Sequence, residues 1–152
     1  MVPRADFALY DPEGHLTTLV EVKSKLGTSP DWAAKLRRNM LAHGGFHTID
    51  FFLLVTPDRL YVWKDAGGKP VPVEPTYELD ARPILQPYFS RAGVEPETIS
   101  GMAFELIVAA WLADLTRAVG AAEKPGGEAS WLRDSGFLGA VRNGRVEFEV
   151  AA

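Results

Sequence analysis

The stretch RADFALYDPEGHLTTLVEVK, residues 4–23, organises the rest of this chain. Its two halves, residues 6–10 and 16–22, are rich in residues that favour β-strands, and the DPEG between them has proline and glycine where a tight turn needs them. The pattern predicts a β-hairpin. With two or four residues in the turn, the numbers of facing residues sum to 25, so Asp6 is expected opposite Leu19 and Arg4 opposite Glu21.

Asp6, Glu21 and Lys23 lie on one face of this predicted hairpin, because side chains alternate along a strand. Diagonal neighbours on two strands are roughly 7 to 8 Å apart at the backbone, so the two carboxylates can converge on one cation. A divalent ion held by one or two carboxylates, with a phosphate completing its shell, is the usual coordination of Mg²⁺. The alternative is a solvated Glu21–Lys23 pair worth under ~1 kcal/mol. Against it, the segment TTLVEV before Lys23 is apolar enough for a central strand, where charges need a reason.

The spacing of these residues resembles the PD-(D/E)XK nuclease superfamily, which has the restriction-endonuclease-like fold. An aspartate is followed after fourteen residues by Glu-Val-Lys at the end of an apolar strand, and residues 3–64 follow the family's order of hairpin, helix and strands. The resemblance implies that Asp6, Glu21 and the Val22 main-chain carbonyl bind Mg²⁺ or Mn²⁺. It also implies that Lys23 orients or activates the attacking water and stabilises charge on the phosphorane.

The sequence departs from this family in two places. Ala5 precedes Asp6 where the motif has proline, and only five residues precede Asp6 where the family's core usually opens with a helix. That helix must come from elsewhere in the chain, or the core is incomplete.

The length and composition indicate one ordinary globular domain. The chain has 152 residues, of which 47% are hydrophobic and 24% charged, and no apolar run reaches the ~18 residues of a membrane-spanning helix. It contains no cysteine, which excludes disulfides and thiolate metal sites. Together with the lack of a recognisable signal peptide, this predicts a cytoplasmic protein.

The net charge of -4 argues against a protein that coats nucleic acid through bulk electrostatics. The charge is uneven, however: residues 1–64 contain eight Lys and Arg against seven Asp and Glu, whereas residues 65–152 contain eight against thirteen. The acidity therefore lies mostly outside the half that contains the proposed site.

Ser29 and Pro30 are typical of a helix start and predict a helix over residues 30–42. Apolar residues at helical spacing form its expected buried stripe, and Lys35, Arg37, Arg38 and Asn39 are expected to be outward or lateral. Basic residues in and before the helix are candidate phosphate contacts, with simple solvation as the alternative: Lys25, Lys35, Arg37 and Arg38. His43 and His47 lack the spacing of a metal site and are expected to cap the helix end.

The rest of the chain alternates between strands and helices. We expect a buried strand over residues 49–55 parallel to its predecessor, a returning strand over 59–64 and a loop over 65–74. Helices are expected over residues 80–92 and 99–119, followed by a flexible connector over 120–129. The chain is then expected to end in a hairpin of residues 137–141 and 145–150 around an Asn-Gly turn. The predicted fold is α/β, with a mixed central sheet flanked by helices on both faces. Within one domain, residues 1–64 would form a restriction-endonuclease-like core, 75–119 a helical segment and 130–152 a C-terminal hairpin.

Glu105 is the one acidic residue in the apolar run 102–113, where burying an unpaired carboxylate is costly. In the family that the motif resembles, the opening helix often carries a glutamate that reaches the metal. The resemblance therefore suggests that the helix over residues 99–119 replaces the opening helix and that Glu105 joins the metal site. The alternative is that Glu105 pairs with an arginine such as Arg4 or Arg59, or faces water.

Two functions follow from these observations. The first is a Mg²⁺- or Mn²⁺-dependent nuclease that hydrolyses phosphodiester bonds in DNA, and the second is a catalytically inactive binding or regulatory module of the same fold. The second is supported by the acidic balance and by the lack of a DNA-reading motif. For the nuclease we expect a homodimer, because two sites related by a two-fold axis cut both strands of a duplex. Apolar interface surface is expected from the segments of Trp111, Trp131 and Phe137.

Overall fold

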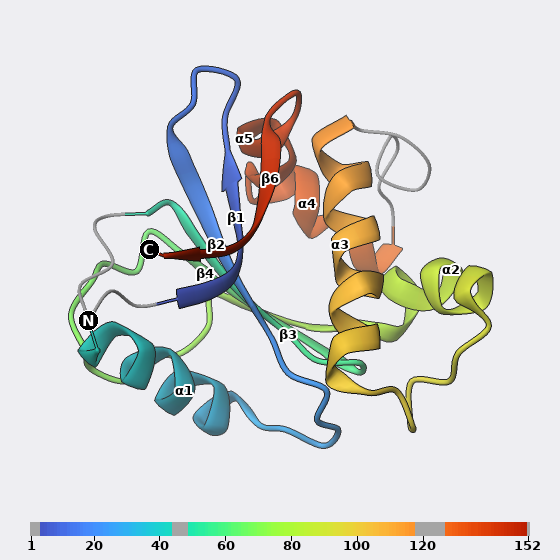
Figure 1. Ribbon diagram of the computed structural model, residues 1–152. Helices are drawn as coiled ribbons and strands as arrows, with labels where there is room; N and C mark the ends of the chain where they lie inside the picture. The colour runs from blue at the N-terminus through green and yellow to red at the C-terminus, as the bar shows by residue number, and fades with distance from the viewer. Residues whose placement is uncertain (1–3, 44–48, 118–126, 152) are drawn as a thin grey trace.

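The computed structural model describes residues 4–43, 49–117 and 127–151 (Figure 1). Its centre is a six-stranded mixed sheet with the strand order β5-β4-β3-β2-β1-β6. The strands are β1 (Arg4–Tyr10), β2 (Leu16–Val22), β3 (Phe51–Val55), β4 (Arg59–Lys64), β5 (Tyr77–Asp80) and β6 (Arg145–Ala151). The helices are α1 (Pro30–Ala42), α2 (Arg82–Ala92), α3 (Gly101–Arg117), α4 (Trp131–Asp134) and α5 (Phe137–Val141), with the short 3-10 helix η2 (Gly127–Ala129) before α4.

The sheet is mixed, and helices cover both of its faces, as predicted. Strands β2 and β3 pair in parallel and are connected through α1, whereas the other neighbouring strands pair antiparallel. Helix α1 lies on one face, and α2 to α5 lie on the other (Figure 1). Each face has its own apolar core, one shared with α1 and one with the other helices. The protein is therefore an α/β fold of three layers.

The β1–β2 hairpin forms, but its register differs from the expected one. Phe7 faces Val20 and Ala8 faces Leu19, so the numbers of facing residues sum to 27 and not to 25. The cause is the turn, because the Asp11 N–H donates to the His15 carbonyl at 2.9 Å and the register shifts once more between Leu9 and Tyr10. A shift of two residues keeps every side chain on its predicted face.

This register decides which face carries the candidate residues. The side chains of Phe7 and Val20 belong to the core under α2 to α5, whereas Ala8 and Leu19 belong to the core under α1. Asp6 and Glu21 alternate with Phe7 and Val20 and so share the α1 face. Continuing the register by one residue places Glu21 directly opposite Asp6, closer than the predicted diagonal.

Helix α1 begins and ends as predicted, but one of its basic residues, expected to be outward or lateral, is buried. Ser29 Oγ accepts a hydrogen bond from the Trp32 N–H at 3.1 Å and caps the helix. Arg37 is only 4% exposed, because it lies on the same helix stripe as Ala33 and Leu41. Its Nη2 donates to the Gly67 carbonyl at 2.8 Å, and its guanidinium lies 5.7 Å from the Trp63 ring centre. Arg37 is therefore not a surface phosphate contact.

The C-terminal hairpin predicted over residues 137–150 is wrong. Phe137, Leu138 and Val141 have helical spacing and form α5, whose apolar side is buried in the core. The Asn143 turn, with φ of 63°, then leads into β6, which pairs with β1. The partner of this strand is thus at the opposite end of the chain, where local sequence cannot indicate it.

Three further expectations change in detail. Residues 77–80 form the unpredicted strand β5, so the helix expected from residue 80 begins at Arg82. Trp111, Trp131 and Phe137 are at most 4% exposed, so the interface expected from their segments is not formed by these side chains. The expected connector over 120–129 lies mostly outside the described residues, and Gly127–Ala129 forms η2.

Within the part of the chain described, no helix is both long and apolar enough to span a membrane.

The contact of Gly144 with β1 gives a stability prediction. A Cβ atom at residue 144 would overlap the Tyr10 carbonyl oxygen. Its other near neighbour, the Val141 carbonyl oxygen, is also a backbone atom and cannot easily move away. We expect Gly144→Ala to lower the free energy of unfolding by about 1 to 3 kcal/mol, because the β1–β6 pairing must shift. The matched control is Gly139→Ala, where nothing lies within 4 Å of the added atom. Urea unfolding of both variants tests this, and equal stabilities would contradict it.

Candidate metal centre

Asp6 and Glu21 meet where the β1–β2 hairpin stops pairing in the usual way. The regular pairs run as far as Phe7 and Val20. Beyond them, the Val22 N–H donates to Asp6 Oδ2 at 2.7 Å. A side chain thus replaces a strand carbonyl, and this hydrogen bond holds the Asp6 carboxylate against β2.

The main-chain carbonyl of Val22 faces the same side as this hydrogen bond. The Lys23 N–H donates to the Val55 carbonyl of β3 at 3.0 Å, so the neighbouring Val22 N–H points the other way, towards β1. The N–H and carbonyl of one strand residue point to the same side. The Val22 carbonyl is therefore directed towards the Asp6 side of β2, as a third oxygen ligand would need to be.

The Glu21 carboxylate is in an environment that disfavours its charge. Its side chain is only 13% exposed. Burial, the largest cause, and the nearby Asp6 carboxylate raise the pKa of Glu21 from 4.5 to about 7, although the Lys23 ammonium acts in the opposite direction. Two carboxylates this close, with one of them buried, repel each other unless a proton or a cation lies between them.

Lys23 supplies the positive charge on the same face. Its Nζ lies 3.5 Å from Glu21 Oε2, and its side chain is 44% exposed. The ammonium thus contacts Glu21 and reaches solvent at the same time. It is placed to meet an anionic group that arrives from outside.

The donor set fits a hard divalent cation. It consists of two carboxylates and a main-chain carbonyl, all oxygen donors, which suit Mg²⁺ or Mn²⁺. Burial, together with the Asp6 carboxylate, raises the pKa of Glu21 despite the nearby Lys23, so a cation between the two carboxylates would favour their ionised form. The structure therefore brings Asp6, Glu21, Val22 and Lys23 together at one place.

Helix α3 reaches the same end of the sheet. A Cβ atom placed on Gly101, the first residue of α3, would lie 3.7 Å from Ser24 Oγ, one residue past Lys23. Glu105 is one turn further along on the same side of the helix as Gly101 and is half-buried. Its neighbours Phe104 and Val108 pack into the core that contains Val22. Helix α3 thus lies against β2, and the ligand role of Glu105 stays a prediction.

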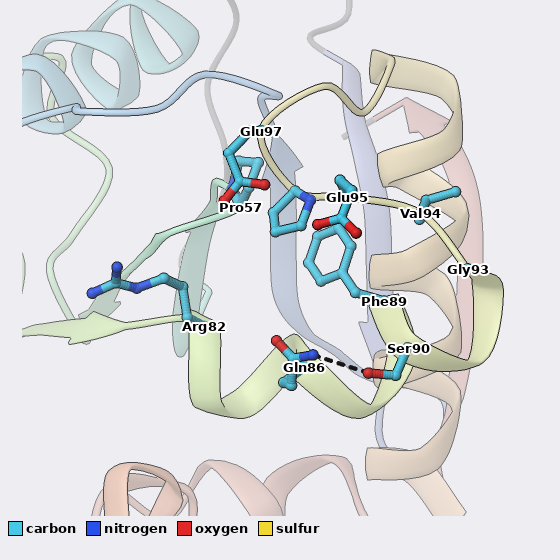
Figure 2. Close-up of a pocket in the computed structure, with 10 residues that line it drawn as sticks. Pro57, Arg82, Gln86, Phe89, Ser90, Gly93, Val94, Glu95 and Glu97 are labelled. Carbon is cyan, nitrogen blue, oxygen red and sulfur yellow. Dashed lines mark hydrogen bonds between the residues drawn. The ribbon is translucent and has the colours of Figure 1, made fainter.

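A polar hollow of about 470 Å³ opens between α2 and the loop that leads to α3 (Figure 2). Glu95 and Glu97 on this loop give it negative charge, and Gln86 Nε2 donates to Ser90 Oγ at 2.9 Å along its α2 wall. No function was predicted for these residues from the sequence. Arg82 also lines the hollow, so its charged side chains are of both signs.

The remaining candidate phosphate contacts lie in and before α1. Lys25 and Lys35 are exposed, and Lys25 Nζ lies 5.3 Å from the centre of the Trp32 ring. Arg38 is half-buried, and its Nε donates to Asn39 Oδ1 at 3.1 Å. Because α1 and the carboxylate pair share a face of the sheet, these cations are on the side from which a polyanion can approach Lys23.

A second group of potential metal ligands lies in the β1–β2 turn. Ligand atoms of Asp11, Glu13 and His15 lie within 4.8 Å of one another. However, Asp11 Oδ1 accepts the His15 N–H at 2.8 Å and its Oδ2 lies 3.2 Å from His15 Nδ1. These contacts account for the cluster as part of the turn. His43 at the end of α1 donates its N–H to the Met40 carbonyl, and His47 lies outside the described residues.

Comparison of the chain with protein-family models, with curated proteins and with solved structures gives no match.

Proposed function

We propose that this chain is a Mg²⁺- or Mn²⁺-dependent nuclease that hydrolyses phosphodiester bonds in DNA. The single observation that carries the proposal is the pair of neighbouring carboxylates, Asp6 and Glu21, with Lys23 beside Glu21 and the Val22 N–H holding Asp6 in place. A purely structural ion pair would place one acid beside one base. Here a second acid, Asp6, stands beside the Glu21–Lys23 ion pair, and the Val22 carbonyl points to the same side.

Each residue has a distinct task in this proposal. Asp6, Glu21 and the Val22 carbonyl would hold the cation, and the Val22 N–H would keep Asp6 in position. When bound, the cation polarises the phosphate and lowers the pKa of an attacking water. Lys23 would donate a hydrogen bond to that water or to a phosphate oxygen, since its ammonium lies beside the carboxylates and reaches solvent.

The arrangement of elements supports a restriction-endonuclease-like core. The β1–β2 hairpin, α1 and the parallel strand β3 follow one another as the resemblance requires. Helix α3, late in the chain, packs against β2, and in this proposal it would take the place of the family's opening helix. The charges favour one direction of approach: nucleic acid would lie over α1, where Lys25 and Lys35 are exposed, and away from Glu95 and Glu97.

A cleavage assay tests the proposed function and separates it from the inactive module. The purified chain is incubated with single- and double-stranded DNA and RNA, in Mn²⁺, in Mg²⁺ or in EDTA. We expect DNA to be cut with either metal and to stay intact in EDTA or with the Asp6→Asn variant. If no substrate is cut with any metal, the chain is the inactive module.

The predicted role of Glu105 can be measured without catalysis. If Glu105 helps to hold the cation, Glu105→Gln should weaken Mn²⁺ binding by about 10- to 100-fold, as is usual for groups that support a metal site. The matched control is Asp114→Asn, a carboxylate further along α3 that accepts a hydrogen bond from the Tyr88 hydroxyl at 2.7 Å. Unchanged Mn²⁺ affinity in Glu105→Gln would assign this residue to another contact.

A further inference from the structure

The two outer strands of the sheet differ in how well they are protected. Strand β5 is only four residues long and carries the acidic residues Glu78 and Asp80. Strand β6 is seven residues long, contains no proline, glycine or lysine, and pairs with β1 without a register shift. Proteins usually protect edge strands by shortness, charge, proline or bulges. β6 lacks proline, bulges and shortness, and its charged residues, Arg145, Glu147 and Glu149, are of both signs; its Phe148 is 62% exposed.

The backbone groups that β6 directs away from β1 can be identified from the ladder. The Val22 N–H points towards β1. Backbone groups alternate in direction along a strand, so the Val20 N–H also points towards β1. Phe7 faces Val20 and therefore directs its own backbone groups towards β2. The Ala8 N–H then points to β6, where Ala8 faces Glu147. It follows that Val146 and Phe148, on either side of Glu147, direct their backbone groups outward.

The side chains of β6 are complementary to a second copy of the same strand. If two β6 strands pair antiparallel about an axis at Val146, the outward groups of Val146 bond with each other across the axis, and Arg145 faces Glu147 of the other copy. Within one copy, Arg145 Nε already lies 3.1 Å from Glu147 Oε1. In the paired state Arg145 and Glu147 of the two copies would therefore surround the axis as four charges of alternating sign. Phe148 would face Gly144 of the other copy, which leaves room for the ring.

We propose that β6 is the homodimer interface of this protein and that two copies join their sheets through it, with Val146 on the two-fold axis. The contact is isologous, so it closes after two copies and does not propagate. It replaces the interface that was expected from Trp111, Trp131 and Phe137. The proposal is independent of the nuclease function, because it rests only on the edge strand and its charges.

Charge reversal tests both the dimer and its register. Analytical ultracentrifugation of the wild-type chain, at micromolar to submillimolar concentration, should show a species of about twice the 16.6 kDa monomer. Arg145→Glu and Glu147→Arg alone should each raise the dimer dissociation constant at least about tenfold, because like charges then face each other. The double variant Arg145→Glu/Glu147→Arg should restore dimerisation. A monomeric wild type, or a double variant as weak as the singles, would overturn the proposal.

Proline at position 148 provides an independent check. Phe148→Pro removes an outward N–H and leaves the bonds to β1 in place, so we expect a folded monomer. Phe148→Ala keeps the N–H and removes only the ring, so it should dimerise more weakly than the wild type but more tightly than the proline variant. Thermal melting of both variants confirms that they fold. A proline variant that folds and dimerises like the wild type would show that β6 is not the interface.

Discussion

Replacing Glu21 with glutamine should stabilise the metal-free protein at pH 8. The pKa of Glu21 is about 7 in the folded chain and 4.5 as its ordinary value. The folded state therefore holds a proton that the unfolded state releases, and stability falls as the pH rises from about 4.5 to 7. Above pH 7 the full cost of ionising Glu21, about 3 kcal/mol, is present. Glutamine does not ionise, so it avoids this cost.

The measurement is urea unfolding in EDTA at pH 4 and at pH 8. At pH 8 we expect Glu21→Gln to unfold at a higher free energy than the wild type, by up to about 3 kcal/mol, and at pH 4 the difference should nearly vanish. Glu74→Gln, on an exposed loop, is the control for the change of charge and should shift stability by no more than about 0.5 kcal/mol. If Glu21→Gln is instead less stable at pH 8, Glu21 is a satisfied partner of Lys23 and the pair is structural.

The second large effect concerns Lys23 and cleavage. Lys23→Ala should lower kcat about 100- to 1,000-fold, the usual loss when a positioned charge beside the reacting group is removed. Mn²⁺ affinity should change little, since Lys23 is not an oxygen ligand. The matched control is Lys25→Ala, two residues along the chain, which should raise KM for DNA and leave kcat nearly unchanged. Single-turnover cleavage measures both, and equal effects of the two variants on kcat would contradict a special role for Lys23.

The face of the candidate site followed from the sequence, but its detailed geometry did not. Side-chain alternation alone placed Asp6, Glu21 and Lys23 together, and a register error of two residues left this unchanged. The register itself depends on a hydrogen bond inside the turn, from Asp11 to His15, which composition does not reveal. The Val22 N–H to Asp6 contact, in turn, exists only because the ladder ends there.

Errors elsewhere in the chain have physical causes of the same kind. Arg37 was expected to be outward or lateral because arginine is usually solvated, although its spacing from Ala33 and Leu41 marks the buried stripe. The segment 137–141 was expected to be a strand because an Asn-Gly pair follows it, yet its apolar residues have helical spacing. β6 pairs with β1 across nearly the full length of the sequence. Long-range pairing of this kind leaves no local pattern.

Calorimetric titration of Mn²⁺ at pH 8 into the wild-type chain and the Glu21→Gln and Asp6→Asn variants tests most directly whether Asp6 and Glu21 form a metal centre. We predict one saturable site in the wild type and loss of the binding heat in both variants, whose fold is confirmed by their melting curves. Equal Mn²⁺ affinity in all three proteins would show that Asp6 and Glu21 do not form the metal centre.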